Sequence, residues 1–283
     1  MKTVPEVMKA LFDRLAPDAT TKVEARGIHS IVWQVLHDRG MVVTASPEAA
    51  KERFDRAIDR EREASSRLRE RGFDEGYIWD EIRRVVAGRS LDTLEAYLVV
   101  TRHGRRMAMT ADDRRGTWKI YQTYMALCRE SSPPVVDHET LLRLASRSLE
   151  SDPPSRRYDA IVVDEAQDIT ESGVRFLIQL LEGGAAGRLL LVGDGGQRIY
   201  PGGYRLADLG LDVRGRSSVL RLCYRSTDEI MSAVGLLGRW LSLGEYGEDG
   251  LGQVEVSTLR VGRRPEMHHF ASGRGTCLDH QPA

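Results

Sequence analysis

The sequence has few cysteines and no long apolar run, which excludes several classes of protein. Its three cysteines, Cys128, Cys223 and Cys277, are odd in number and form no C-x-x-C pair, so neither a disulfide framework nor a structural zinc site is indicated. No stretch approaches about 18 consecutive apolar residues, so a membrane span is not expected. The N-terminus has no apolar run behind Lys2, so we expect no secretory signal and a cytoplasmic protein.

The sequence is also poor in lysine and nearly neutral. Only five of its 41 basic residues are lysine, and 42 acidic residues bring the formal net charge to −1. This balance gives no global attraction to nucleic acid, so any site for a polyanion has to be local. Arginine suits bidentate contact with phosphate, which makes the clustered arginines candidate contacts, with a solvated surface as the simpler interpretation. These clusters are Arg102 with Arg105 and Arg106, Arg114 with Arg115, Arg156 with Arg157, and Arg214 with Arg216.

What is present is typical of a globular chain with a sizeable core. The 283 residues are 41% hydrophobic and 29% charged. Apolar residues at helical spacing predict helices over residues 4–15 and 29–39, followed by a charged, helix-rich block over residues 47–150. Within that block we expect helices over residues 74–87, 91–100, 113–130 and 138–149. Asp137 is the expected N-cap of the last one.

After residue 151 the pattern changes to short apolar runs typical of buried strands. Residues 161–163, 189–192 and 219–222 form three such runs, whose starts lie 28 and 30 residues apart. This spacing matches β-α-β crossovers, with an amphipathic segment at residues 172–182 between the first two runs, and predicts parallel strands. A further strand is possible at residues 253–258. The predicted fold class is therefore α/β, a parallel sheet with a large helical insertion.

Polar residues follow each of the three apolar runs. Asp164 and Glu165 follow the first, Gln197 comes shortly after the second, and Tyr224 and Arg225 follow the third. Ligands of open parallel sheets bind outside the carboxyl ends of the strands, so these groups are expected to converge. Of two adjacent carboxylates, one can hold Mg²⁺ while the other deprotonates an attacking water. An amide and a guanidinium near a terminal phosphate complete a set that fits nucleoside-triphosphate hydrolysis.

The same segments resemble the UvrD/Rep-type superfamily 1 DNA helicases. Residues 158–168, Y-D-A-I-V-V-D-E-A-Q-D, resemble motif II of that family, the Walker B element with its D-E-x-Q-D signature. Residues 191–200 resemble motif III, with the pattern G-D-x-x-Q-x-I-Y, and residues 222–227 resemble motif IV. Residues 27–30, G-I-H-S, resemble a degraded motif Ib. The resemblance implies a RecA-like sheet of the P-loop NTPase type.

The resemblance also assigns roles at the nucleotide. Asp164 would coordinate Mg²⁺, and Glu165 would be the catalytic base. Gln167 and Gln197 would contact the γ-phosphate of ATP or its attacking water. Arg225 would sense the γ-phosphate.

Three further residues are assigned to the adenine of ATP or to DNA. Tyr224 would stack near the adenine of ATP. Tyr200 would lie against a base of single-stranded DNA, where stacking contributes about 1–3 kcal/mol per base. His29 of motif Ib would contact DNA, with an ordinary surface or capping histidine as the alternative.

The resemblance further implies a division of the chain. Residues 1–46 would be a truncated N-terminal part of the first RecA-like motor domain, and residues 47–150 the helical insertion on it. Residues 151–242 would complete that domain. Residues 243–283 would form an irregular tail that begins a truncated second motor domain.

Three departures from the family pattern shape the expected function. The sequence contains no G-x-x-x-x-G-K-[ST] phosphate loop and no motif V or VI, and Cys223 replaces the usual asparagine of motif IV. We therefore expect a partial UvrD-like ATP-dependent DNA helicase, not an active motor by itself. The intact family couples ATP hydrolysis to 3′–5′ translocation on single-stranded DNA, with roles in DNA repair. A second chain or a missing segment would complete the ATP site.

A second hypothesis remains open beside the first. The chain would then be a non-catalytic remnant that binds single-stranded DNA or docks to a partner. A phospho-acceptor receiver domain also has an acid after a parallel strand. That interpretation leaves Gln197, Tyr224 and Arg225 unexplained.

Overall fold

The structure is a computed structural model, and it consists of two compact units. It describes residues 4–15, 23–102, 105, 107–154, 157–193, 206–213, 215–220, 222–241 and 257–266. The first unit runs from Met1 to Val213 and the second from Arg214 to Ala283. Each unit is described by itself below. The domain boundaries expected from the sequence stay predictions.

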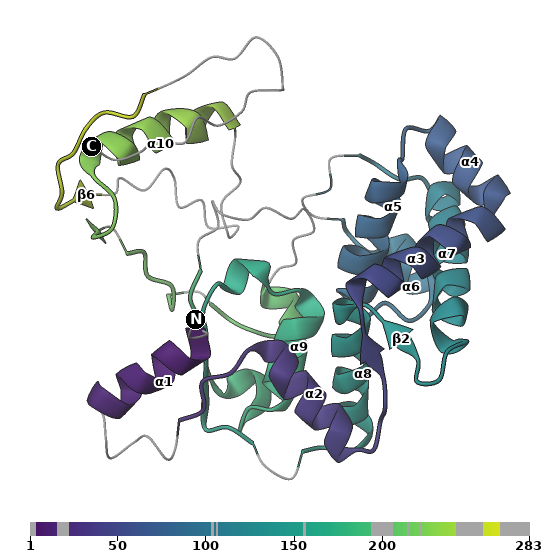
Figure 1. Ribbon diagram of the computed structural model, residues 1–283, viewed down its shortest axis with the longest axis horizontal. Coiled ribbons are helices and arrows are strands. Elements are labelled where there is room, and N and C mark those ends of the chain that lie inside the picture. The colour runs from purple at the N-terminus through teal and green to yellow at the C-terminus, as the bar shows by residue number, and fades with distance from the viewer. Residues whose placement is uncertain are drawn as a thin grey trace. The chain divides into compact units, whose positions relative to one another are not determined.

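Helices make up most of the first unit (Figure 1). They are α1 (Val4–Leu15), α2 (Ile28–Asp38), α3 (Pro47–Arg60), α4 (Arg62–Glu70), α5 (Glu75–Asp80), α6 (Leu94–Val99), α7 (Ala111–Arg129), α8 (His138–Ser151) and α9 (Glu171–Gln179). A π-helix over Glu81–Ala87 continues α5 directly. The helices expected from apolar spacing are thus confirmed, with bounds shifted by a few residues and with residues 74–87 divided between α5 and the π-helix.

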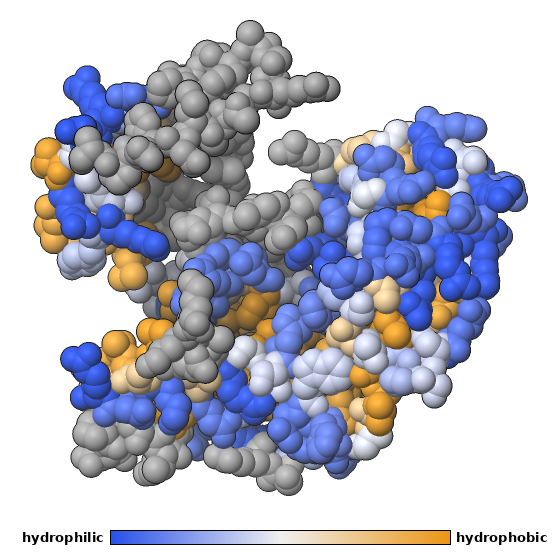
Figure 2. Space-filling view, in the orientation of Figure 1, coloured by the Kyte–Doolittle hydropathy of each residue, from blue (hydrophilic) through white to orange (hydrophobic). Residues whose placement is uncertain are grey.

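The helices of the block over residues 47–150, which we call the insertion after its predicted role, pack around α7. Helices α3 and α4 both contact α7 (Figure 1). Buried aromatic side chains belong to the core between these helices. The rings of Phe54 and Trp79 lie 4.8 Å apart, and Trp79 meets Tyr124 edge-on at 5.4 Å. The outward faces of α3, α4 and α7 carry mostly hydrophilic residues (Figure 2). The charge-rich sequence of this block is therefore the solvated side of amphipathic helices.

Helix starts in the insertion follow local capping chemistry. Ser46 accepts a hydrogen bond from the backbone N–H of Ala49, with Pro47 in the first turn of α3. Thr110 and Asp113 form a capping box at the start of α7. Asp137 caps α8 as expected, accepting from the N–H groups of Glu139 and Thr140. Short polar side chains in the sequence thus mark the helix boundaries.

The first unit contains two parallel strand pairs. Strand β1 (Thr44–Ala45) pairs with β2 (Val135–Val136), and β3 (Ala160–Val163) pairs with β4 (Arg188–Leu191). The parallel arrangement expected of the first two apolar runs is confirmed. Helix α9 provides the crossover between β3 and β4, because its Phe176 and Leu177 are buried in the core that also contains Val163.

The second unit holds the third apolar run. Strand β5 (Leu222–Cys223) pairs in parallel with β6 (Ser257–Thr258), with helix α10 (Asp228–Leu241) between them in sequence. Among the described residues of the third run only Leu222 lies in a strand, and Val219 and Leu220 are exposed outside it, so the expected buried strand over residues 219–222 is not found. Strand β6 falls within the possible strand at residues 253–258, and its pair with β5 forms a sheet of its own. Among the described residues the strands form three two-stranded parallel sheets. The expected larger parallel sheet is not shown. No described helix is long and apolar enough to cross a membrane.

Candidate functional site

The candidate site begins at the turn after β3, where two exposed carboxylates follow a buried valine. Val163 is 7% exposed, whereas Asp164 and Glu165 are exposed to solvent. The backbone N–H of Glu165 donates to Oδ1 of Asp164 over 3.0 Å. This bond orients the Asp164 carboxylate. The parallel strand thus delivers two adjacent acids to its carboxyl end, as the sequence predicts.

Glu165 adopts a left-handed backbone conformation. Its φ is 52° and its ψ is 42°, a region that costs a residue other than glycine about 1 kcal/mol or more. Two backbone bonds hold it there. The N–H of Ala166 donates to the carbonyl of Val192 over 2.8 Å, and the N–H of Asp168 donates to the carbonyl of Glu165 over 3.0 Å. Such retained strain is typical of functional positions.

Gln167 links Glu165 to the end of β4. It is buried, 6% exposed, and its Nε2 donates to Oε2 of Glu165 over 2.5 Å. Gly193, directly after β4, lies against it. A Cβ built on Gly193 would lie 2.5 Å from Oε1 of Gln167 and 3.1 Å from the backbone nitrogens of Ala166 and Gln167. A larger residue at position 193 would therefore require the Gln167 side chain to shift, whereas glycine lets the two strand ends approach this closely without that shift.

The ends of β3 and β4 therefore converge, as we expect of parallel neighbours. The third pair of predicted residues, Tyr224 and Arg225, follows β5 in the second unit, and both are exposed. Their meeting with Asp164 stays a prediction. Gln197 and Tyr200 lie outside the described residues.

The donors at the end of β3 fit Mg²⁺ in the form that nucleotide sites use. Carboxylate oxygens are hard ligands, and Mg²⁺ is commonly bound through one or two carboxylates together with substrate phosphates. Within the described ranges, no group of three or more acids, histidines or cysteines is positioned to hold a metal by itself. Asp164 and Glu165 therefore fit an ion that takes its remaining ligands from phosphate and water.

Residues 164–168, which we call the motif II turn, are followed by the first turn of α9, and this turn is bonded to neighbouring elements. The Thr170 hydroxyl donates to Oε2 of Glu139 in α8 over 2.7 Å, and the N–H of Ser172 donates to the carbonyl of Gly88 over 2.8 Å. The side chain of Glu171 is 9% exposed and lies 3.9 Å from the Arg89 guanidinium. The turn is thus tied to α8 and, through Gly88 and Arg89, to the insertion.

His29 is the second residue of α2, and the structure packs it against another histidine. The ring centroids of His29 and His138 lie 4.5 Å apart, and both side chains are half-buried. Burial lowers the pKa of His29, and the neighbouring His138 lowers it further. Neutral imidazole is thus favoured at His29. Its assignment to DNA contact stays a prediction.

Two arginines proposed as phosphate contacts instead hold a buried carboxylate. Glu81 is fully buried, and its two oxygens accept from Nε of Arg102 over 2.6 Å and from Nε of Arg105 over 2.8 Å. The Tyr97 hydroxyl also donates to Glu81 over 3.0 Å. Arg114 donates to the backbone carbonyls of residues 97, 98 and 100. These guanidinium groups therefore bind partners within the insertion and hold its segments together.

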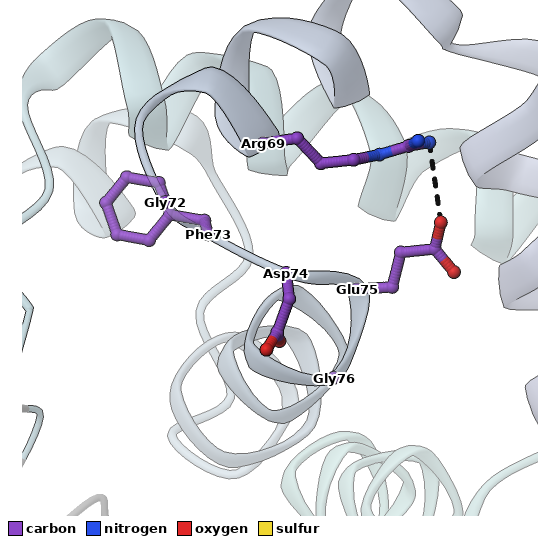
Figure 3. Close-up of a pocket in the computed structure, with 6 residues that line it drawn as sticks. All are labelled: Arg69, Gly72, Phe73, Asp74, Glu75 and Gly76. Carbon is purple, nitrogen blue, oxygen red and sulfur yellow. Dashed lines mark ion pairs between the residues drawn. The ribbon is translucent and has the colours of Figure 1, made fainter.

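The described pockets lie away from the motif II turn. One depression in the insertion has a volume of about 460 Å³ and is lined by Arg69 and residues 72–76 (Figure 3). Arg69 and Glu75 form an ion pair of 3.4 Å within this lining. A smaller pocket lies between α8 and α9, where its arginines pair with Asp92 and Glu171. Neither pocket offers a set of groups for phosphoryl chemistry.

Three features of this site have only weak signals in the sequence. The Gln167–Glu165 bond joins residues two apart, a separation that any loop can contain. Gly193 directly after an apolar strand was a usable signal of close backbone approach. The His29–His138 pair joins helices more than a hundred residues apart, and periodicity carries no information about such a contact.

The comparisons with known proteins support the resemblance at the level of the family. Residues 8–211 match the model of the UvrD/REP helicase N-terminal domain. That match covers well over half of the 283 residues and includes the insertion, β3 and β4. No curated protein matches the chain. With this match the chain belongs to the UvrD/REP helicase family.

Proposed function

We propose that this chain supplies the Walker B half of the ATP site of a UvrD-like helicase, which couples ATP hydrolysis to movement on single-stranded DNA. The observation that carries the proposal is the Glu165–Gln167–Gly193 contact. Membership of the family supports a helicase function and, with it, ATP, Mg²⁺ and DNA as ligands. The contact adds a reason to assign the hydrolytic roles to these particular residues.

Each residue of the turn has a defined task in the proposed reaction. Asp164 would hold the Mg²⁺ of Mg²⁺-ATP, the ion that neutralises charge on the phosphates. Glu165 would accept a proton from the attacking water. Gln167 holds the Glu165 carboxylate through its amide, at a distance of 2.5 Å, so the base stays oriented. Gln197 and Arg225 would stabilise the transferred phosphoryl group.

The proposal includes a phosphate loop from another segment or chain. The printed sequence lacks G-x-x-x-x-G-K-[ST], and that loop contributes a lysine, backbone N–H groups and a Mg²⁺-binding hydroxyl in this class of enzyme. The exposed face of the β3–β4 pair supports the proposal that a further segment packs here. Val162 and Leu190 are partners in register, yet they are 68% and 55% exposed. Parallel sheets are normally covered on both faces, so added structure would fit here.

Binding of a fluorescent ATP analogue, with and without Mg²⁺, tests the assignment of Asp164. We expect weak binding that depends on Mg²⁺ and loses that dependence in Asp164→Asn. Glu182→Gln, an exposed acid beyond α9, is the matched control and should bind like the wild type. Equal Mg²⁺ dependence in Asp164→Asn and wild type would contradict the assignment.

A further inference from the structure

Thr170, two residues after the motif II turn, makes a hydrogen bond to the insertion instead of capping its own helix. It is the N-cap residue of α9, yet among the described residues no backbone N–H of that helix donates to its hydroxyl. The hydroxyl donates to Oε2 of Glu139, the second residue of α8, over 2.7 Å. N-cap threonines ordinarily stabilise the helix that they begin. Here the same group joins α8 and α9, which lie side by side (Figure 1).

Glu139 in turn lies within reach of the charges of the π-helix. Its side chain is buried, and burial raises the pKa of its carboxyl. The hydrogen bond from Thr170 opposes this rise, as do the charges of Arg84 and Arg83, whereas Asp137 adds to it. A buried acceptor that loses its donor bears the full cost of its desolvation, so moving Glu139 away from Thr170 is unfavourable. The contact therefore has a fixed partner on the insertion side.

A second connection to the insertion lies beside the first. The N–H of Ser172 donates to the carbonyl of Gly88, directly after the π-helix, over 2.8 Å. The Glu171 carboxylate lies 3.9 Å from the Arg89 guanidinium, whose Nη1 donates to the carbonyl of Thr101 over 2.7 Å. Three successive positions at the start of α9 thus contact the insertion.

The motif II turn itself lies between this connection and the sheet. On the sheet side β3 pairs with β4, and the N–H of Ala166 donates to the carbonyl of Val192 over 2.8 Å. On the α9 side only Ile169 separates Asp168 from Thr170. One residue of chain spans at most about 3.6 Å, so a displacement of Thr170 is passed on to the turn. The insertion therefore determines where one end of the turn lies.

We propose that Thr170 is a positioning residue, through which Glu139 and the insertion hold the motif II turn in the geometry that binds Mg²⁺-nucleotide. This inference rests on the proposed function, because Asp164 is the group that would hold Mg²⁺ there. It goes further by naming the insertion as the part of the chain that regulates the site. Coupling between two sites is reciprocal, so nucleotide at the turn stabilises the contact between Thr170 and Glu139 in return.

Hydrogen exchange of the full chain, without nucleotide and followed by mass spectrometry, tests the contact. The N–H groups of Glu165, Ala166 and Asp168 all donate hydrogen bonds, so their exchange reports opening of the turn. Thr170→Val replaces the hydroxyl by a methyl group of similar size. We expect exchange over residues 164–168 to become about 5- to 30-fold faster, the factor typical of a lost buried hydrogen bond. Unchanged exchange there overturns the proposal.

Two further variants are the matched controls. Thr123→Val removes another threonine hydroxyl that donates to a glutamate, Glu61, over the same 2.7 Å, but within the insertion. Exchange over residues 164–168 should stay at the wild-type rate in this variant and in Thr170→Ser, which keeps the hydroxyl. Equal acceleration in both valine variants would indicate a general loss of stability and overturn the proposal. If Thr170→Val does not fold, Thr170→Ala removes the same bond without placing a methyl group against Glu139.

Mg²⁺-dependent binding of the fluorescent ATP analogue separates positioning from stability alone. Thr170→Val should lower the Mg²⁺-dependent affinity by about 3- to 10-fold, within the range of couplings through packed networks, and leave binding without Mg²⁺ unchanged. Thr170→Ser should bind like the wild type. Wild-type Mg²⁺ dependence in Thr170→Val, despite faster exchange, overturns the positioning role. Absence of Mg²⁺ dependence in the wild type would instead overturn the proposed function, and the exchange result would then decide on the Thr170–Glu139 contact by itself.

Discussion

At the scale of single residues, the candidate site depends on how closely Gly193 approaches Gln167. The amide of Gln167 is buried between the strand ends and holds the Glu165 carboxylate. A side chain at position 193 competes for the same space. Glu165 meanwhile keeps a left-handed conformation through backbone bonds to its neighbours. A substitution that adds a methyl group at position 193 therefore tests the contact between Gly193 and Gln167.

Gly193→Ala is expected to destabilise the protein by about 1–3 kcal/mol, because the new methyl group would overlap Oε1 of Gln167. Gly27→Ala is the matched control, since no atom lies within 4 Å of its added Cβ. It should change stability by less than about 1 kcal/mol. Urea denaturation measures both. Equal effects of the two substitutions would contradict the packing at Gly193.

The lowered pKa of His29 gives a pH dependence with a defined sign. The folded state binds this proton less readily than the unfolded state, so His29 contributes stability above its ordinary pKa of about 6.5. That contribution falls as the pH drops through this value toward the folded pKa. Titration by NMR should place His29 below 6.5. His138→Asn should raise its pKa only in part, because burial is the larger cause.

The two described cysteines should differ in reactivity. Burial raises the pKa of Cys128 to about 11, and its side chain is fully buried. At Cys223, N–H groups of Ser226 and Arg225 point to Sγ and lower the thiol pKa. Iodoacetamide at pH 7.5 should therefore modify Cys223 well before Cys128, as followed by peptide mass spectrometry. Faster labelling of Cys128 in the folded protein would contradict this order.

At the scale of elements, a buried charge cluster holds the segment between α6 and α7 against the π-helix of the insertion. Arg102 and Arg105, on the segment between α6 and α7, both bind Glu81 of the π-helix. Arg105 also lies over the ring of Tyr77, 4.0 Å from its centroid. The segment between two helices is thereby fastened to a third. Its arginine-rich sequence serves this packing, although it resembles a phosphate-binding run.

Glu81→Gln is expected to destabilise the protein by about 3–5 kcal/mol, because it leaves two buried guanidinium groups without their carboxylate. Glu63→Gln on α4 is the control. Its partner Arg67 is 68% exposed, so this ion pair should contribute less than about 0.5 kcal/mol. Thermal unfolding compares the two variants. Similar melting temperatures for both would contradict the buried cluster.

Elements are also the scale at which the sequence is most informative. Apolar spacing and caps such as Asp137 predicted α8 and α7 closely, because helix ends depend on local chemistry. The spacing of two apolar runs predicted the parallel β3–β4 pair. The π-helix at residues 81–87 and the separate pairing of β5 with β6 were missed. Both depend on packing between distant segments, for which periodicity carries no signal.

At the scale of the whole molecule, the family could be predicted from the sequence. The way in which the site residues come together could be predicted only in part. Motif II placed Asp164 and Glu165 correctly at the end of a parallel strand, because a buried run followed by acids is a local pattern. The partner of Glu165 and the contact at Gly193 required coordinates. The roles of Tyr224 and Arg225 rest on their meeting with the first unit, which stays a prediction.

Hydrolysis of Mg²⁺-ATP by the purified chain, with and without poly-dT, is the measurement that tests the central claim most directly. The claim is that the chain holds the Walker B half of the site and depends on a phosphate loop supplied from elsewhere. It predicts turnover no higher than that of Glu165→Gln, whether or not DNA is present. Turnover that rises with poly-dT and disappears in Glu165→Gln would contradict it, since the chain would then be a complete ATPase.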